Sequence, residues 1–380
     1  MEMFIMTTFV AIFLTCFLSL GIGQQWQNSG FPDVTSVGFV AISGNEGEAT
    51  AAFSDNTQGP GSGFSSDLGD SWSYQSGGWL NTGIDINENG DAVMSTIGKT
   101  FYRNGYDGTW TQVDGKALSF SQWVECFGDE DFSVAGDHYP KGPFGEYING
   151  VAVTHNAGVT WDYFDIGLDS SNYPARYSSF PNKDVWYVTA GTWKSTPKVI
   201  ETIENPLMRS EWSINQHFQS VNASFTYKGT DLGENLHFGA IVKSVDGGKS
   251  WRQVYKTSDY YVNMISCLTE DMCMAVAEQP NEAVVLRTED GGAHWNTMLT
   301  LTDSKMASLM GCSMISESEV WVSGGTFDKG LQGWFYHSTD GGQTWEKSMT
   351  PGASIGLAFK NNVGYSPSIY EFHSAINVYK

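Results

Sequence analysis

The chain has 380 residues, with 42 Asp and Glu against 20 Lys and Arg, for a formal net charge of −22 at pH 7. Nucleic-acid backbones and anionic membrane surfaces attract clustered cations, so this balance argues against both partners and leaves neutral or cationic ones open. Gly is abundant at 43 and Trp at 14, which is typical of many short strands joined by glycine turns, each with an aromatic anchor.

The first residues form an apolar segment. Residues 3–23 are almost wholly apolar, and Gly21 and Gly23 precede a polar pair. This pattern predicts a secretory signal peptide over residues 1–23, although it lacks the usual positive charge. A retained signal anchor is the alternative, because the segment nearly reaches membrane-spanning length. We therefore expect a secreted protein with no membrane insertion after cleavage, and a single domain over residues 24–380.

A short pattern, Ser/Thr-x-Asp-x-Gly-x-Ser/Thr-Trp, organises the rest of the chain. The Asp can accept from a backbone N–H two residues on, the Gly supplies a positive φ, and the Trp buries an aromatic face between neighbouring units. Each copy therefore predicts a β-hairpin turn with a structural role. The third and last positions of the five copies are Asp67 and Trp72, Asn156 and Trp161, Asp246 and Trp251, Asp290 and Trp295, and Asp340 and Trp345.

Two degenerate copies, ending at Trp110 and Trp212, fill the long gaps. The seven Trp residues are then spaced by 38, 51, 51, 39, 44 and 50 residues, close to the period of a four-stranded propeller blade. The segments before each turn are rich in β-branched and aromatic residues, and none has a sustained helical period. We therefore predict an all-β, seven-bladed β-propeller of four-stranded antiparallel blades. Blade one covers about residues 33–74 and blade seven about 306–349; residues 352–380 close the ring or begin an eighth blade.

The repeat resembles the Asp-box, or bacterial neuraminidase repeat, of β-propellers that include sialidases, xyloglucan-active glycosidases, sortilin-type receptors and photosystem II assembly factors. The resemblance implies the fold and says little about activity. Over the whole chain it is strongest to the photosystem II assembly and stability factors, which implies protein binding without catalysis. We do not expect a sialidase, because that family grips the substrate carboxylate with three Arg side chains, and here only Arg176 begins an inner strand.

The cysteines and one sequon suit an exported protein. Cys267 and Cys273 flank the turn of one predicted hairpin, so a cross-strand disulfide is within reach. Cys126 and Cys312 occupy equivalent positions in distant blades, which favours two free buried thiols over a second bridge. Asn222 begins an Asn-Ala-Ser sequon and is a predicted glycan acceptor.

The predicted functional residues lie in long loops. In a four-stranded blade the box turn joins the third and fourth strands, so the loop between the second and third emerges at the opposite face, where binding residues are expected. Asp137 and Glu278 could form an acid/base pair for glycoside cleavage. One His beside one Asp lacks metal-site spacing, and we expect no cofactor or metal. The candidate ligand-binding residues are Asp137, His138, Tyr139, Trp193, Glu278 and Asp328.

We therefore expect a secreted, monomeric binding module that takes a protein or glycan ligand on the loop-bearing face. The alternative is a glycan-degrading enzyme, hydrolase or lyase, that uses Asp137, Glu278, His138 or Tyr139. A purely structural matrix or coat protein is a third possibility.

Overall fold

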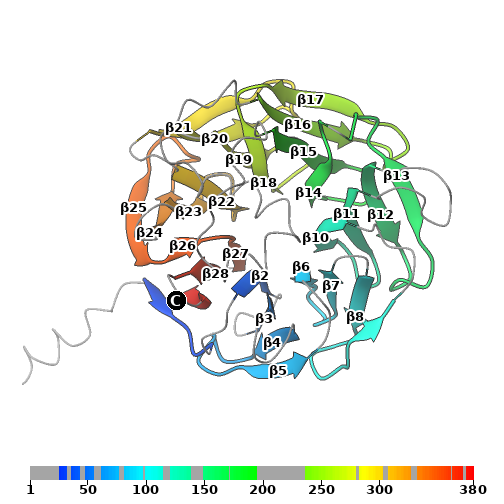
Figure 1. Cartoon of the computed structure of the whole chain (residues 1–380), viewed down its shortest axis with the longest axis vertical. Helices are drawn as coiled ribbons and strands as arrows, with labels where there is room; N and C mark the ends of the chain where they lie inside the picture. Colours follow the sequence, from blue (N-terminus) through cyan, green and yellow to red (C-terminus); the bar gives the residue numbers. More distant parts are fainter. Residues whose placement is uncertain are drawn as a thin grey trace, which may run out of the picture.

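The computed structural model describes residues 25–31, 36–42, 48–54, 61–76, 81–96, 99–113, 120–137, 149–170, 172–194, 236–279, 282–302, 307–326, 332–360, 362–370 and 374–380. Within these residues every regular element is a β-strand, and no helix that could span a membrane is found. The strands form seven antiparallel sheets that surround a common axis as blades (Figure 1). The predicted seven-bladed, all-β propeller is therefore confirmed.

Six blades follow one another along the chain, and in each of them four strands pair in sequence order with the first strand innermost (Figure 1). The strands of blades 1 to 6 are β2 (Ser36–Ile42), β3 (Ala49–Ser54), β4 (Gly61–Ser65), β5 (Ser73–Ser76); β6 (Asn81–Ile86), β7 (Ala92–Thr96), β8 (Lys99–Arg103), β9 (Thr111–Gln112); β10 (Phe120–Cys126), β11 (Phe132–Asp137), β12 (Asn149–Thr154), β13 (Asp162–Asp165); β14 (Ala175–Ser179), β15 (Trp186–Lys194), β16 (Leu236–Ser244), β17 (Arg252–Thr257); β18 (Tyr261–Cys267), β19 (Cys273–Gln279), β20 (Glu282–Thr288), β21 (Asn296–Leu301); β22 (Ala307–Met314), β23 (Val320–Thr326), β24 (Gln332–Ser338) and β25 (Glu346–Pro351). The strands of blade 7 are β26 (Ala353–Ser354), β27 (Ala358–Lys360), β28 (Val363–Ile369), β29 (Ser374–Tyr379) and β1 (Trp26–Asn28).

Blade 7 combines the two ends of the described chain. β26 and β27 both pair with β28, which pairs with β29, and β29 pairs with β1, with Trp26 opposite Tyr379. The Trp26 ring also stacks on Phe335 of blade 6, with 3.9 Å between ring centroids. The N-terminal strand β1 therefore completes blade 7 and pairs with the outer edge of β29, which joins the two ends of the described chain.

Two details of the predicted blade assignment are wrong. Residues 306–349 form the sixth blade, and residues 352–380 supply most of the seventh rather than an eighth. The unit predicted to end at Trp212 is not a blade, because β15 and β16 pair directly, from Trp186 opposite Ser244 to Lys194 opposite Leu236. Residues 195–235, among them Trp212, lie outside the described residues and connect two adjacent strands of blade 4.

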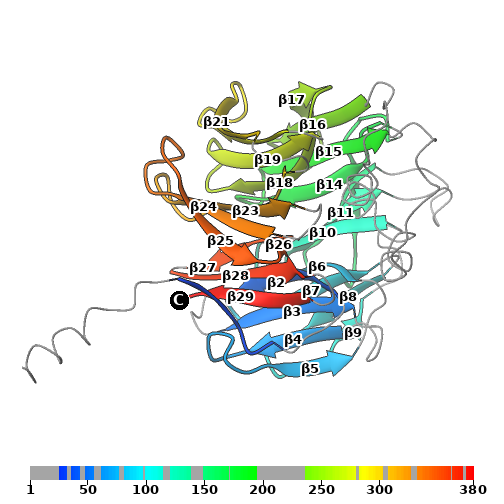
Figure 2. The same cartoon turned by 60° about the vertical axis from the view of Figure 1, so that its left-hand side comes forward.

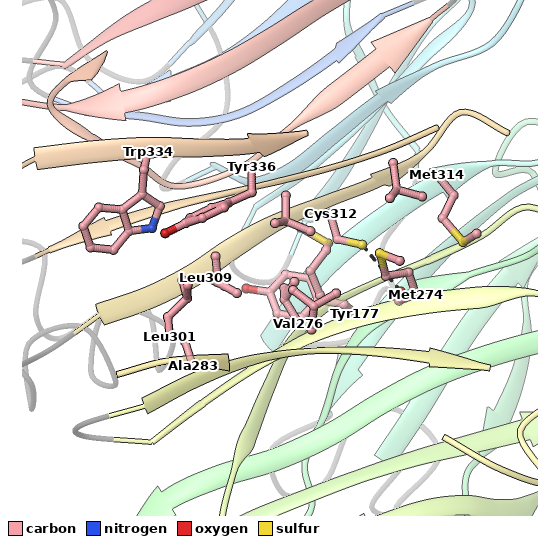
Figure 3. Packing of buried hydrophobic residues seen from close by; sticks show 14 residues of the cluster. Tyr177, Met274, Val276, Ala283, Leu301, Leu309, Cys312, Met314, Trp334 and Tyr336 are labelled. Atoms are coloured by element: carbon pink, nitrogen blue, oxygen red, sulfur yellow. Dashed lines mark hydrogen bonds between the residues drawn. The ribbon is translucent and has the colours of Figure 1, made fainter. Parts of the chain in front are cut away.

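The hydrophobic core lies between adjacent blades. Because alternate side chains of a strand point to opposite faces of its sheet, each blade packs on both of its neighbours. Between blades 5 and 6, Met274 and Val276 of β19 meet Leu309 and Cys312 of β22 (Figure 3). The ring is thus held by a series of inter-blade clusters, and burial of their apolar surface is the main stabilising contribution.

Each box turn is held by its own side chains. In blade 6, Ser338 Oγ accepts from the Gly342 N–H at 2.7 Å, and Asp340 Oδ1 accepts from the Thr344 N–H at 2.8 Å. The carboxylate therefore reaches four residues on, and the shorter contact predicted for it is made by Ser338, which accepts from the Asp340 N–H at 3.3 Å. Gly342 has a φ of 94°, as predicted. Equivalent bonds occur around Asp67, Asn156, Asp246 and Asp290.

The Trp at the end of each box packs against a neighbouring blade. Trp345 Nε1 donates to the carbonyl of Gly342 in its own turn at 2.9 Å and to that of Met298 in blade 5 at 3.3 Å. Trp72 of blade 1 packs edge-on against Tyr365 of blade 7, with 6.2 Å between ring centroids. These two indoles therefore link adjacent blades.

Buried cations tie two of the box turns to the preceding blade. Arg287, just before the blade 5 box, is 5% exposed, and its Nη1 donates to the carbonyls of Glu317 at 2.9 Å and Gly341 at 2.8 Å in blade 6. Lys243, at the same place in blade 4, donates to the Gly291 carbonyl of the blade 5 box at 3.4 Å. These side chains satisfy turn carbonyls that would otherwise be buried without a partner.

The predicted disulfide and the two predicted free thiols are present, but only one of these thiols is fully buried. Cys267 and Cys273 lie directly opposite each other in β18 and β19 and form a disulfide. Cys312 is buried and Cys126 partly covered, and both are free thiols. Burial raises the pKa of both thiols well above the ordinary value, which makes them poor nucleophiles. Asn222 lies outside the described residues.

Candidate functional site

The two faces of the ring differ in the connections they carry. Box turns and the hairpins between first and second strands lie on one face, the box face. The second strands end and the third strands begin at the other face, the loop face, because antiparallel strands run alternately between the faces (Figure 2). The longest connections between second and third strands by residue number are 138–148 in blade 3 and 195–235 in blade 4, and both lie outside the described residues.

The topology carries the candidate ligand residues on four successive blades of the loop face. Asp137 ends β11 in blade 3, Trp193 is next to last in β15 of blade 4, and Glu278 is next to last in β19 of blade 5. The connection with Asp328 joins β23 to β24 in blade 6. The ligand roles stay predictions, because the described residues exclude His138, Tyr139, Asp328 and the side chains of Asp137 and Trp193.

Glu278 is the one candidate whose side-chain surroundings are described. It is 2% exposed, and its carboxyl accepts a hydrogen bond from the Ser308 hydroxyl of blade 6. Burial raises the pKa of Glu278 to about 7, against the opposing effect of hydrogen bonds from Ser308 and Asn263. A carboxyl with that pKa can take up or release a proton near neutral pH, as a general acid or base must.

Further polar side chains lie beside Glu278 at the start of the inner strands. Tyr261 is directly opposite Glu278 in the sheet, and Arg176 is 1% exposed with Nε donating to the Gly191 carbonyl at 3.1 Å. Burial raises the pKa of Tyr177 and of Tyr261; the Arg176 charge opposes this shift and the Glu278 charge adds to it. We call Arg176, Tyr177, Tyr261 and Glu278 the inner polar cluster.

A second polar region, at the box-face end of the central channel, was missed by reasoning from the loops. A pocket of about 320 Å³ opens there between the inner strands. Its rim holds one residue from the same register position of five successive blades, a few residues after the irregularity that each inner strand carries. We call them the rim residues: Asp85, Glu125, Ser179, Ser266 and Ser313. Aligning the inner strands with one another would have found them.

The first four rim residues make the same bond to the next blade. Asp85 Oδ2 accepts from the Cys126 N–H at 2.7 Å, and Glu125 Oε1 accepts from the Phe180 N–H at 2.8 Å. In the next two blades the acceptors are the hydroxyls of Ser179 and Ser266, at 3.0 and 3.1 Å from the donating nitrogens of Cys267 and Met314. The rim is therefore a ladder of side-chain to backbone bonds around the channel.

The ionised forms of the two rim carboxyls, Asp85 and Glu125, are disfavoured. Burial raises the pKa of Asp85 to about 6 and that of Glu125 to about 8, and the negative charge of Asp85 adds to the shift of Glu125. Both side chains are only partly covered, so they face the pocket and not a dry core. Among the described residues no group of three or more His, Cys, Asp or Glu side chains is arranged to hold a metal ion.

The box turns have the opposite electrostatic character. Hydrogen bonds from the Thr344 hydroxyl and N–H hold the pKa of Asp340 down to about 2, and those from the N–H and ring of His294 do the same for Asp290. An unfolded Asp titrates near pH 4. Each carboxylate therefore stabilises the fold fully above about pH 4, and this contribution is lost as the pH falls through about 2.

We expect Asp340→Asn to fold but to lose this pH-dependent contribution. The box of blade 3 has Asn156 at the same place, and its Oδ1 accepts from the Thr160 N–H at 2.8 Å, so an amide suits the turn. The difference in melting temperature between wild type and variant should shrink as the pH falls from 4 to 2, because only the wild-type carboxylate becomes protonated. Thermal melts across this range check it, and a constant difference would contradict it.

Six four-stranded blades and a five-stranded seventh, with box turns between the third and fourth strands of blades 1 and 3 to 6, define the chain as a seven-bladed Asp-box β-propeller. The model of the BNR/Asp-box repeat matches residues 336–347, which is the turn of blade 6. Among curated proteins no sequence matches the chain.

Solved structures share the fold at low sequence identity. The chain is similar to YCF48 bound to D1 peptide, with a TM-score of 0.57 and 11% identity over 94% of this chain and 96% of that one. It matches YCF48 from Cyanidioschyzon merolae with the same score and identity, over 93% and 98%. It is also similar to a polysaccharide lyase, PL25 ulvan lyase, with a TM-score of 0.53 and 8% identity over 92% and 95%. A peptide-bound protein and an enzyme thus have this fold, which leaves function to be argued from the sites.

Proposed function

We propose that the chain is a secreted Asp-box propeller that binds a protein or glycan ligand on the loop face. The observation that carries this proposal is the direct pairing of β15 with β16, because it leaves residues 195–235 as one long connection between two adjacent strands whose paired ends lie at the loop face. Long connections on a rigid scaffold are where binding residues concentrate. The peptide bound by YCF48 supports the protein-binding hypothesis, although only through the similarity of the two folds.

The inner polar cluster supports the same face. It lies at the loop-face ends of β14, β18 and β19, and it holds an Arg, two Tyr and a Glu that are each 2% exposed or less. Buried polar groups that converge beside a binding face are suited to fixing the orientation of a ligand. A ligand bound at the loop-face ends of blades 4 and 5 would lie over these side chains.

The test compares changes on the two faces. The chain from residue 24 onward is immobilised and offered a glycan array and the secreted proteins of its source. We expect saturable binding that His138→Ala with Tyr139→Ala weakens at least tenfold. The matched control is Val159→Ser on the box face, where Val159 is 81% exposed, and it should bind as wild type. Loss of binding in the box-face variant alone, or no saturable ligand, would refute the proposal.

A glycan-degrading enzyme is the second candidate, favoured by the Glu278 carboxyl with its pKa near 7. The ulvan lyase supports it by analogy of fold alone. Incubation with a panel of polysaccharides should then release new chain ends, and the double change Asp137→Ala and Glu278→Ala should abolish the release. Activity that survives the double change would exclude these residues as the acid/base pair, and no release on the panel would favour the binding reading.

A further inference from the structure

The rim residues offer a comparison within the molecule. In blades 4 and 5 a serine hydroxyl accepts the N–H of the next blade, at 3.0 Å for Ser179 and 3.1 Å for Ser266. In blades 2 and 3 the same bond is made by Asp85 and Glu125. One acceptor oxygen satisfies this backbone bond, and a carboxyl brings a second oxygen and an ionisable proton; in Glu125 the second oxygen, Oε2, also accepts from the Ser178 hydroxyl at 3.3 Å. Two blades therefore hold more polar chemistry at the rim than the ring requires.

In the protein without a ligand, the ionised form of these two carboxyls is unfavourable. A carboxyl that is partly desolvated resists ionisation, and two that repel each other do so further. Among the described residues neither Asp85 nor Glu125 has an ion-pair partner. Lys360 is the described cation that acts on Asp85, and its Nζ contacts Glu88 Oε1 at 3.0 Å. Partly desolvated carboxyls without a cationic partner are a common property of ligand sites.

The pocket has room and an apolar wall beside these carboxyls. Its volume of about 320 Å³ lies within the range of small-molecule sites. Trp123, Met264, Met314, Leu357 and Phe359 line it together with the rim residues. The rim hydroxyls add hydrogen-bond acceptors around the mouth. The pocket thus presents an apolar wall to one part of a ligand and acceptor oxygens to another.

We propose that the box-face end of the central channel binds a small organic monocation, a primary or secondary amine on an apolar body, with its ammonium group held by Asp85 and Glu125. The N–H donors of the ammonium bond to the carboxyl oxygens that the backbone leaves over, and the body packs on Trp123 and Phe359. Near neutral pH the pair carries about one negative charge, because the pKa of Asp85 is about 6 and that of Glu125 about 8. This matches a single positive charge. The site lies on the face opposite the proposed protein or glycan ligand and is independent of it.

The test uses phenethylamine as the probe, in isothermal titration calorimetry with the whole chain from residue 24. We expect saturable binding of phenethylamine and at least tenfold weaker binding of 2-phenylethanol and phenylacetate, which have the same body without the positive charge. Binding at pH 7 should also release protons, because an ammonium favours the ionised form of Glu125. Titrations in buffers of different ionisation enthalpy measure that release.

Variants locate the site. Glu125→Gln and Asp85→Asn keep an oxygen for the backbone bond, and each should weaken phenethylamine at least tenfold; Glu125→Gln should also end the proton release. Glu125→Ser, which copies the residue of blades 4 and 5, replaces Glu125→Gln if the latter fails to fold in a thermal melt. Asp162→Asn, an exposed carboxylate on the outer strand of blade 3, is the control of equal charge change and should bind as wild type.

Three results would overturn the proposal. The first is no saturable binding of phenethylamine to the wild type, and the second is equal binding of 2-phenylethanol. The third is unchanged affinity in both Asp85→Asn and Glu125→Gln. The wild-type comparison of amine with alcohol does not depend on the folding of any variant.

Discussion

Replacing Arg287 with Leu is expected to lower the free energy of unfolding by about 3 kcal/mol. The guanidinium is 5% exposed and donates to the carbonyls of Glu317 and Gly341 across the boundary between blades 5 and 6. It also forms a two-point ion pair with Glu289, with Nη2 at 2.8 Å and Nε at 2.9 Å from Oε1. The variant leaves two turn carbonyls without a donor, and their desolvation is not compensated. Urea denaturation monitored by tryptophan fluorescence measures the change.

Lys183→Met serves as the control for Arg287→Leu. Lys183 is exposed on the box face of blade 4, and removing its charge should change the free energy of unfolding by less than about 0.5 kcal/mol. The free energy of unfolding of Arg287→Lys should lie between those of the two variants, because an ammonium group keeps the charge but loses the forked geometry of the guanidinium. Equal stability of Arg287→Leu and Lys183→Met would show that the blades do not depend on this tie.

Gly248→Ala is expected to cost about 3 kcal/mol, and it combines two unfavourable effects. Gly248 has a φ of 81°, which L-residues with a Cβ adopt only at a cost. A methyl group there would overlap the Trp186 ring and lie 2.8 Å from the Phe164 ring of blade 3. The box turn would have to move away from the neighbouring blade. The shift of the urea midpoint at constant slope checks this expectation.

The preceding glycine separates the two effects. Gly247 has a φ of 65°, but a methyl group there would meet nothing closer than the Lys183 carbonyl oxygen at 3.7 Å. Gly247→Ala should therefore cost only the backbone strain, about 1 kcal/mol. If both variants lose the same stability, the close contact with Trp186 and Phe164 does not contribute.

The ring of blades was predictable because the box is a local signal. Its hydroxyl, carboxylate, glycine and indole all act within one turn or on the next blade, so the pattern at Ser338–Trp345 defines its own structure. The errors arose where we inferred a blade from the spacing of Trp residues without a complete box. Trp212 falls at a blade-like interval, but it lies within a connection of blade 4. Blade 7 has no box to mark it, and one of its strands comes from the other end of the chain.

The candidate site residues were likewise predictable only in part. Loop residues such as His138 and Tyr139 were chosen because long loops carry function, and that reasoning says nothing about what their side chains contact. Asp85 and Glu125 were overlooked because each lies in a strand, where an acidic residue is normally expected to face solvent. Their role depends on the non-local register of the blades, since Asp85 bonds to a residue 41 positions later in the sequence and Glu125 to one 55 positions later. Only comparison with Ser179 and Ser266, at the same step of later blades, sets them apart.

The pairing of β1 with β29 constrains how the molecule is assembled during synthesis. Blades 1 to 6 are contiguous, so each can form as it emerges from the ribosome, whereas Trp26 must wait for Tyr379. This contact has nearly the longest sequence separation available to the chain, and such closures are slow because most of the polypeptide must be ordered first. A nascent chain that stops before β29 would keep a solvent-exposed strand edge on β28. Partners fused directly before β1 and directly after β29 would both be attached to blade 7, so both would act on the final step of ring formation.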